Sequence, residues 1–202
     1  MVIELVVATR NRNKTHEIQH ILGPGFRVHD LGVHPDISKI REDGTSFEEN
    51  AKLKALTASR QLPGLVIADD SGLEVDSLGG APGIYSARYA GANATEKDKI
   101  DKLLRELDLV RGTDDRRGAR FRCVVALARN GSVLGTFEGI VEGTIANEVR
   151  GDYGFGYDPI FVPEGFEQTF GELPEEVKDA ISHRAKAIRA LADRLRRLEF
   201  GG

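Results

Sequence analysis

LVIADDSGLEVD, residues 65–76, begins with four apolar residues, continues with two adjacent aspartates and contains two further acids, Glu74 and Asp76. The four apolar residues at 65–68 follow a proline and a glycine and are typical of a strand that is covered on both faces. We therefore expect a buried strand that delivers Asp69 and Asp70 to a turn at its carboxyl end. Because neighbouring negative charges repel one another, the arrangement predicts a cation nearby.

The segments on either side of this run alternate between strand and helix patterns. Residues 2–8 form a nearly continuous apolar run, and residues 13–22 follow with apolar residues at helical spacing. Ser46 and Glu49 match a capping box at the start of a helix that extends to Arg60. The remaining expected elements are a strand at 26–31, a helix that begins after Thr95 and ends near 107, strands at 121–129, 132–145 and 159–162, and a closing amphipathic helix.

A tight turn and the order of the elements indicate the fold class. Asn130 and Gly131 both tolerate the positive φ of a type I′ turn, so the strands around them are expected to form a hairpin. Buried, parallel-type strands early in the chain and a hairpin later predict an α/β fold, with a mixed central sheet and flanking helices. Because no repeat or linker divides the chain, residues 1–202 predict a single domain, either one unit or two small lobes that share a sheet.

The composition excludes several classes of protein. The 202 residues are 40% apolar, and 28 basic against 32 acidic side chains give a net charge of −4, which predicts no binding to nucleic acid or to an anionic membrane surface. No apolar stretch approaches the roughly 20 residues of a membrane span, and the basic residues near the start follow the apolar run instead of preceding it. The single cysteine, Cys123, lies in an apolar run and fits a reducing compartment, which we take to be the cytoplasm.

A polar loop follows the first expected strand. It offers a hydroxyl, two amides and three cations beside the amino end of a helix, where amide donors and the helix dipole favour an anion. This chemistry predicts a phosphate-binding loop, although the stretch also fits a solvated basic turn and lacks the spacing of a Walker A motif. The residues concerned are Thr9, Arg10, Asn11, Arg12, Asn13 and Lys14.

The adjacent acids Asp69 and Asp70 suit a hard cation such as Mg²⁺, which binds through one or two carboxylates and bridges to substrate phosphates. One of the two carboxylates is also a candidate base for an attacking water. The alternative is a polar turn whose aspartates accept hydrogen bonds from backbone amides. Glu42 is a candidate third metal ligand, or else an ordinary surface acid.

Two further segments complete the set of candidate groups. Residues 154–159, GFGYDP, place two aromatic rings and an acid between glycines, which suits stacking on a nucleobase and equally suits a hydrophobic plug beside the sheet. Residues 182–184, SHR, stand at the start of the last expected helix and fit either a group that recognises the base or a serine cap followed by polar surface residues. Together with the phosphate loop and the acids, these segments predict a nucleoside triphosphate site.

Five motifs in this order resemble the inosine triphosphate pyrophosphatase family, and the resemblance covers nearly the whole chain. The motifs are TRNRNKTHE at 9–17, SFEENAKLKA at 46–55, ADDSGLEVDSLGGAPGIYSARYAG at 68–91, GFGYDPIF at 154–161 and SHR at 182–184. The resemblance implies Mg²⁺-dependent hydrolysis of ITP, dITP and XTP to the monophosphate and pyrophosphate. It also implies a homodimer of elongated, two-lobed subunits with the active-site cleft between the lobes.

The resemblance also assigns roles to particular residues. Asp70 would accept a proton and contact Mg²⁺ together with Glu42 and Asp69, while Lys14 would neutralise phosphate charge. The residues expected to bind substrate are Thr9, Arg10, Asn11, Arg12, Asn13, Lys14, Ser71, Phe155, Gly156, Tyr157, Asp158, Lys178, His183 and Arg184. Arg12 stands where the family commonly has a small residue.

Two other functions compete with this interpretation. One is a pyrophosphatase for modified pyrimidine triphosphates, and the other is a nucleotide-binding regulator that has lost turnover. The presence of both Lys14 and Asp70 argues against the regulator. Discrimination among purines would rest on the 6-oxo group, because donors in the base loop accept hypoxanthine or xanthine and leave a polar group unpaired against adenine.

Overall fold

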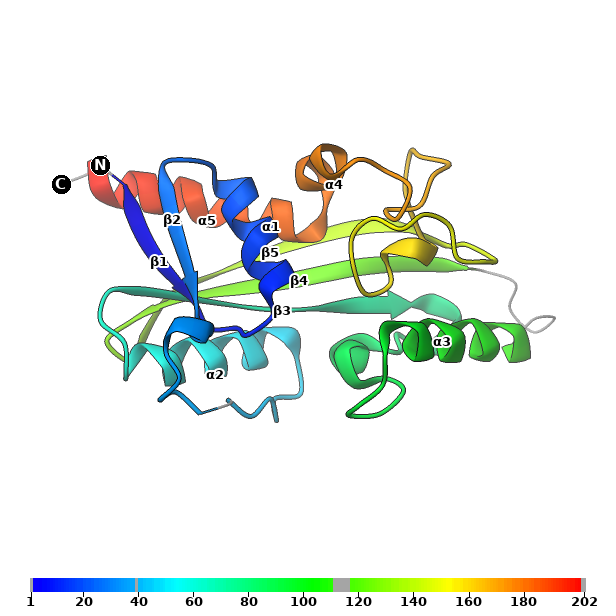
Figure 1. Cartoon of the computed structure of the whole chain (residues 1–202), viewed down its shortest axis with the longest axis horizontal. Helices are drawn as coiled ribbons and strands as arrows, with labels where there is room; N and C mark the ends of the chain where they lie inside the picture. Colours follow the sequence, from blue (N-terminus) through cyan, green and yellow to red (C-terminus); the bar gives the residue numbers. More distant parts are fainter. Residues whose placement is uncertain (1, 39, 111–116, 201–202) are drawn as a thin grey trace. The chain divides into compact units, whose positions relative to one another are not determined.

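The computed structural model describes residues 2–38, 40–110 and 117–200, and it contains one six-stranded sheet with helices around it (Figure 1). The strands are β1 (Ile3–Val7), β2 (Phe26–Asp30), β3 (Leu65–Val75), β4 (Gly118–Arg129), β5 (Ser132–Ile145) and β6 (Phe161–Pro163). The α-helices are α1 (Arg12–Leu22), α2 (Phe47–Ser59), α3 (Glu96–Val110), α4 (Glu175–Ile181) and α5 (His183–Phe200).

The sheet is mixed, as the sequence predicted. Its strands lie in the order β2-β1-β3-β4-β5-β6. β1 runs parallel to β2, with Ile3 opposite Phe26, and parallel to β3, with Leu5 opposite Leu65. At the other end of the order β5 and β6 are antiparallel. The α/β prediction with a mixed central sheet is therefore confirmed.

The chain divides into two compact units, each assembled from separate segments. Unit 1 contains Met1–Asp70, Cys123–Gly139 and His183–Gly202, and unit 2 contains Ser71–Arg122 and Ile140–Ser182. Strands β3, β4 and β5 each contribute to both units. On β3 the division falls immediately after Asp70.

Unit 1 has helices on both faces of its strands. α1 and α5 lie on one side and α2 lies on the other (Figure 1). The first side is a continuous apolar cluster in which Ile18 of α1 and Leu191 of α5 pack with Ile67 of β3. α2 turns an apolar face of Phe47 and three buried alanines toward the interior. A strand covered on both faces explains why the run at 65–68 shows no polar alternation.

The two helices that flank β3 in unit 1 begin at side-chain caps. Asn11 caps α1, where its Oδ1 accepts hydrogen bonds from the amides of Asn13 and Lys14. Ser46 caps α2 by accepting from the amide of Glu49 at 3.2 Å. The Glu49 carboxylate accepts from the amide of Thr45, one residue before the cap, and not from that of Ser46 as in a capping box, so the serine cap is confirmed and the return bond is displaced by one residue.

Local turn chemistry sets the hairpin as predicted. Asn130 has φ 52° and Gly131 has φ 75°, both in the left-handed region that a type I′ turn requires. The last strand is displaced from its predicted bounds at 159–162, because Asp158–Ile160 forms a 3-10 turn and the strand begins only at Phe161.

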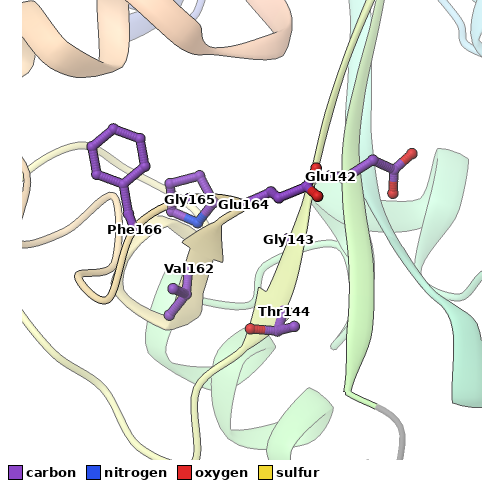
Figure 2. Close-up of a pocket in the computed structure, with 8 residues that line it drawn as sticks. Glu142, Gly143, Thr144, Val162, Glu164, Gly165 and Phe166 are labelled. Carbon is purple, nitrogen blue, oxygen red and sulfur yellow. The ribbon is translucent and has the colours of Figure 1, made fainter.

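Unit 2 has an aromatic core of its own. Phe121, Phe161 and Phe170 pack together, with 4.6 Å between the ring centroids of the first two. α3 adds its buried leucines and an isoleucine to the same cluster. A pocket of about 430 Å³ lies where β5 meets β6 (Figure 2). Glu142 and Glu164 give it an acidic lining, and Val162 and Phe166 add apolar surface.

The composition led to predictions about the single cysteine and about membrane-spanning segments. Cys123 is fully buried, and burial raises the pKa of its thiol to about 12, so it behaves as a small apolar residue as expected. Within the described ranges, each helix is too short or too polar to cross a lipid bilayer.

Candidate functional site

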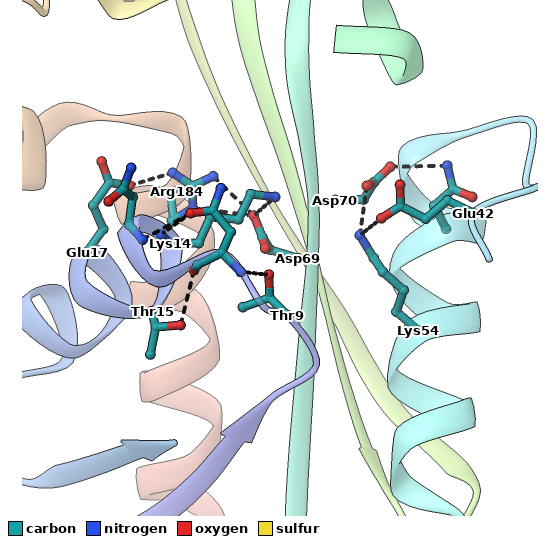
Figure 3. A network of polar contacts seen from close by, with 12 residues as sticks. Thr9, Lys14, Thr15, Glu17, Glu42, Lys54, Asp69, Asp70 and Arg184 are labelled. Atoms are coloured by element: carbon teal, nitrogen blue, oxygen red, sulfur yellow. Dashed lines mark hydrogen bonds and ion pairs between the residues drawn. The ribbon is translucent and has the colours of Figure 1, made fainter. Parts of the chain in front are cut away.

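Strand β3 does not end at the acids, contrary to the expectation of a turn after residue 68. It continues from Leu65 to Val75 and includes Asp69, Asp70 and Ser71. Successive side chains of a strand point to opposite faces, so the two adjacent carboxylates diverge. Figure 3 shows Asp69 on one side of β3 and Asp70 on the other. Each acid therefore has its own surroundings within unit 1.

Asp69 faces α1 and α5 and is held by two cations. Its Oδ2 lies 3.0 Å from Nζ of Lys14 and 3.1 Å from Nη2 of Arg184. Arg184 also donates to the carboxylate of Glu17 through Nη1. The side chains of Asp69 and Arg184 are 1% and 2% exposed, so this is a buried ion network in which two acids meet two bases.

The network determines the protonation of its members. Burial alone would raise the pKa of Asp69, but the charges of Lys14 and Arg184 outweigh burial and hold that pKa well below its usual range. Burial would lower the pKa of Arg184, and Glu17 and Asp69 together raise it. Both shifts favour the charged forms of the two groups.

Asp70 faces α2 and meets a different set of groups. Its Oδ1 accepts a hydrogen bond from Nζ of Lys54 at 2.8 Å, and its Oδ2 accepts one from the amide of Asn50 at 3.2 Å. The same Lys54 ammonium lies 2.7 Å from Oε1 of Glu42. Two carboxylates, one from β3 and one from the loop before α2, therefore converge on a single cation (Figure 3).

The balance of burial and charge differs on this side of the strand. Burial raises the pKa of Asp70 and outweighs the opposing charge of Lys54, and the negative charge of Glu42 adds to the rise. Lys54 is itself buried, yet the charges of Asp70, Asp69 and Glu42 raise its pKa. The pKa values of the two adjacent carboxylates therefore move in opposite directions. Asp69 is stabilised in its charged form, and Asp70 is the acid better able to take up a proton.

Sequence reasoning missed three residues of this centre. Asn50 and Lys54 occupy the buried face of α2, between Phe47 and its buried alanines, and Glu17 is buried on α1. Asn50 and Lys54 lie four residues apart on an otherwise apolar face of the expected helix. Because such residues are seldom buried without a partner, this spacing could have indicated a buried polar site. For Glu17 the partner is 167 residues away in sequence, and no local signal identified it.

The predicted phosphate loop is ordered by its own side chains. The hydroxyl of Thr9 accepts from the amide of Asn11, and Nη2 of Arg10 donates to the carbonyl of Ile37 at 2.7 Å. Lys14 is only 18% exposed and reaches Asp69. The solvated basic turn therefore does not describe Lys14, and it stays an alternative for the exposed residues 10–13. The alternative of a polar turn at the aspartates is wrong, because Asp69 and Asp70 lie within β3. Arg12 and Asn13 are exposed at the start of α1.

Unit 2 contains the aromatic loop with its acid and its lysine. The carboxylate of Asp158 is buried, accepting from the amide of Phe155 at 2.8 Å and pairing with Nζ of Lys178 at 2.6 Å. A Cβ at position 154 would lie 2.1 Å from that carboxylate, so only Gly154 admits it. The Lys178 ammonium also lies 4.7 Å from the centroid of the Phe155 ring.

Not every aromatic residue of this loop is available to a ligand. Tyr157 is 4% exposed, belongs to the apolar core of unit 2 and donates its hydroxyl to the carbonyl of Ser86 at 3.0 Å. The hydrophobic-plug alternative thus describes Tyr157, whereas Phe155 and Gly156 are half-buried. Ser71, at the start of unit 2, is also half-buried within β3.

The segment at 182–184 is not a polar surface, which excludes that alternative. Ser182, His183 and Arg184 are 2%, 4% and 2% exposed. Arg184 belongs to the ion network of unit 1, so its observed role is to hold Asp69 and Glu17. Recognition of a base by His183 stays a prediction.

The donor chemistry on the α2 face fits a divalent cation. The Lys54 ammonium already occupies a point within 2.8 Å of oxygens from both Asp70 and Glu42, which shows that two hard oxygen ligands reach one position. Asp69 lies on the opposite face of β3 and is engaged by Lys14 and Arg184. Of the three acids predicted as metal ligands, the fold therefore brings together Asp70 and Glu42 and separates Asp69 from them.

Comparison with known proteins identifies the family. Residues 5–194 match the model of the Ham1 family, so the chain belongs to the Ham1 family. A dITP/XTP pyrophosphatase from Desulforamulus reducens is 46% identical to it over 197 residues, which are 97% of this chain and 97% of that protein. The resemblance drawn from the five motifs is thereby confirmed.

Solved structures of relatives have the same fold. A HAM1 protein from Coxiella burnetii has a TM-score of 0.86 and 40% sequence identity, covering 96% of this chain and 98% of that chain. A structure named as a nucleoside-triphosphatase and dITP/XTP pyrophosphatase, from Mycobacterium abscessus, has a TM-score of 0.73 and 40% identity, covering 94% and 98%. The mixed sheet with flanking helices is therefore the fold of the family.

Proposed function

We propose that this chain hydrolyses non-standard purine nucleoside triphosphates, with ITP, dITP and XTP as substrates, to the nucleoside monophosphate and pyrophosphate. It is an enzyme, a nucleoside triphosphate pyrophosphatase. Its relatives over nearly the full chain length carry the name dITP/XTP pyrophosphatase. The reaction would remove damaged purine nucleotides from the nucleotide pool.

One observation carries the chemical part of the proposal. Asp70 and Glu42 converge on the Lys54 ammonium, and the pKa of Asp70 is raised by burial. A carboxylate with a raised pKa is a better proton acceptor at near-neutral pH than an ordinary one. Asp70 is therefore proposed as the base that takes the proton of the attacking water.

The neighbouring groups have supporting roles in this mechanism. Lys54 holds Asp70 and Glu42 in place before substrate arrives. Lys14, at the amino end of α1, is placed to neutralise phosphate charge, and its ion pair with Asp69 fixes its direction. Asp69 is a positioning residue in this scheme, because both of its cations are already engaged.

Mg²⁺ is the proposed cofactor. Asp70 and Glu42 would hold it, and when bound it would supply positive charge to the phosphate oxygens and lower the pKa of a coordinated water. The hard oxygen ligands on the α2 face support this choice. Lys54 would then share its two carboxylates with the ion, so the lysine and the cation are expected to compete for the same oxygens.

Recognition of the base is assigned to the loop of unit 2. Lys178 supplies a cationic donor next to the Phe155 ring, and Asp158 fixes both by bonding to the lysine and to the amide of Phe155. A donor at this position suits the 6-oxo group of hypoxanthine or xanthine and would be left unpaired against the 6-amino group of adenine. Asp158→Asn should therefore reduce the preference for ITP over ATP.

A substrate panel tests the reaction itself. Pyrophosphate release is measured for ITP, XTP, dITP, GTP, ATP and a methylated UTP, each with and without Mg²⁺, on the same preparation. Rapid release from ITP and XTP that requires Mg²⁺ is the expected outcome. Preference for the pyrimidine would replace the substrate assignment, and absence of release from every triphosphate would leave only a binding protein.

Two further properties are included in the proposal, of which the family resemblance implies only the first. The first is a homodimer, which sedimentation tests: a single species near 22 kDa at micromolar concentration would contradict it. The second is a cytoplasmic location, supported by the buried free thiol of Cys123.

A further inference from the structure

A second pocket, in unit 1, is lined in part by Arg10 and Arg12 of the predicted phosphate loop, on the side of α1 away from Lys14. It has a volume of about 530 Å³, within the range of small-molecule sites. α1 forms one wall, and the end of β2 with the following 3-10 turn, Leu31–Val33, forms the other. The lining residues are Arg10, Arg12, Thr15, His16, Gln19, Val28, Asp30, Gly32 and Val33.

Helix geometry separates this pocket from the acids. Residues of an α-helix are offset by about 100° each, so the positions of Arg12, His16 and Gln19 fall roughly opposite Lys14. Lys14 points to Asp69, and none of the residues that line the pocket belongs to that ion network. One helix thus serves the acid centre with one face and the pocket with the other.

Several lining groups are already engaged in the fold. The amide of Gln19 donates to the carbonyls of Gly23 and Phe26 and accepts from the amide of Val28, so it holds α1 against β2. The carboxylate of Asp30 accepts from the amide of Gly32 at 2.7 Å. These two polar side chains are structural, and a ligand would have to be recognised by the others.

The hydroxyl of Thr15 also bonds within the fold, to the carbonyl of Asn11 and to the carboxylate of Asp30, so two arginines and a histidine remain for a ligand. Arg10 uses Nη2 for the carbonyl of Ile37 and keeps its other donors. Arg12 is exposed and lines the pocket from the first turn of α1. The ring of His16 stacks on that of His20, with 5.7 Å between centroids, which presents a flat surface at the pocket wall. Two guanidinium groups and an imidazole therefore face one carboxylate.

We propose that this pocket binds the phosphate group of a small phosphorylated molecule, at a site separate from the acid centre. Planar guanidinium groups bind phosphate oxygens through paired hydrogen bonds, and Arg10 and Arg12 supply them. Val33, which is 64% exposed at the rim, and the His16 ring provide a wall for an organic group. The pocket at β5 and β6, with its two glutamates, has the opposite charge and would reject the same ligand (Figure 2).

Amide NMR distinguishes this pocket from the acid centre. Inorganic pyrophosphate and IMP are titrated separately into the full chain without Mg²⁺, and the signals of Gly32 and Val33 are followed. Both probes should shift these signals, and Arg12→Gln should weaken the response about 10-fold, the scale of one charge-assisted hydrogen bond. His16→Glu should weaken it further without unfolding the protein, because His16 is exposed.

Matched variants make the outcome decisive. Arg27→Gln removes an exposed arginine of β2 that pairs with Glu4 outside the pocket, and it should leave the titration unchanged. Lys14→Ala removes the cation of the acid centre and should preserve the shifts of Gly32 and Val33. Tighter binding of IMP than of pyrophosphate would mean that the apolar wall takes part. Unmoved pocket signals at millimolar concentrations of both probes, or equal weakening by Arg12→Gln and Arg27→Gln, would overturn the proposal.

Discussion

On one face of β3 the carboxylate of Asp69 is locked between Lys14 and Arg184, and on the other the carboxylate of Asp70 shares Lys54 with Glu42. The two residues are neighbours in sequence and nearly equally buried, at 3% and 7% exposure. Their pKa values nevertheless move in opposite directions. Burial raises the pKa of both acids, but two cations lie against Asp69, whereas the one cation that pairs with Asp70 is shared with Glu42.

This difference separates a structural function from a chemical one. An acid whose charge is fully compensated by buried cations contributes to the fold and does not exchange protons near neutral pH. An acid that shares one ammonium with a second acid remains able to titrate and to accept a metal ion. The same strand therefore offers rigidity on the α1 and α5 side and reactivity on the α2 side.

The largest expected effect breaks the Asp69 side. Arg184→Met leaves Asp69 and Glu17 buried without their common cation, which should cost about 3 to 5 kcal/mol of unfolding free energy. Urea denaturation measures the loss. Arg27→Met is the matched control, because its pair with Glu4 is exposed and should contribute less than about 1 kcal/mol. Equal losses in the two variants would show that the buried network does not stabilise the fold.

The next effect concerns the Asp70 side. Asp70→Asn keeps the shape of the side chain and removes its capacity to accept a proton, so turnover should fall by about 10²-fold or more. Steady-state pyrophosphate release measures it, and circular dichroism should show a folded protein. Near-normal ITP hydrolysis by this variant would end the assignment of Asp70 as the base.

The pH dependence of stability sharpens the comparison. The pKa of Asp69 is lowered by folding, so its contribution is present above the ordinary aspartate value of about 3.9 and is lost as pH falls through the lower folded value. The pKa of Asp70 is raised, so its contribution is present below about 3.9 and is lost as pH rises through the folded value.

Denaturation curves without divalent ions, recorded from pH 3 to 7, measure both contributions. The stability of the wild type relative to Asp69→Asn should increase with pH, whereas its stability relative to Asp70→Asn should decrease. Slopes of the same sign would refute the assignment of opposite pKa shifts to the two carboxylates.

The smallest effect tests the helices that carry the cations. Asn11→Ala removes the cap of α1, and Ser46→Ala removes the cap of α2; each should cost about 1 kcal/mol. Thermal unfolding measures both losses. If the helices only present their cations, Ser46→Ala should affect turnover far less than Asp70→Asn does. A comparable loss of turnover would mean that the position of α2 itself limits catalysis.

Much of the fold was predictable because its signals are local. The turn at Asn130 and Gly131 requires positive φ at two successive residues, and few residue types adopt it. The caps at Ser46 and Thr95 likewise depend on contacts within four residues. The candidate phosphate loop and the acids were found in the same way, from runs of polar residues that follow apolar ones.

What failed depended on contacts between distant segments. The acids were expected to end a strand, because isolated charges inside a sheet are unfavourable, but Lys14, Arg184 and Lys54 compensate them and β3 continues. The segment at 182–184 was open to interpretation as polar surface, because nothing near it in sequence indicated that Arg184 would be buried against Asp69.

The sequence by itself determined the α/β class, the family, the helix caps, the hairpin and the identity of the groups able to do chemistry, since each depends on residue type and short spacing. Only the tertiary structure decided which acid meets which cation. That decision rests on the alternation of side chains along β3, which sends adjacent carboxylates to opposite faces, and on helices that deliver cations from positions up to 115 residues away.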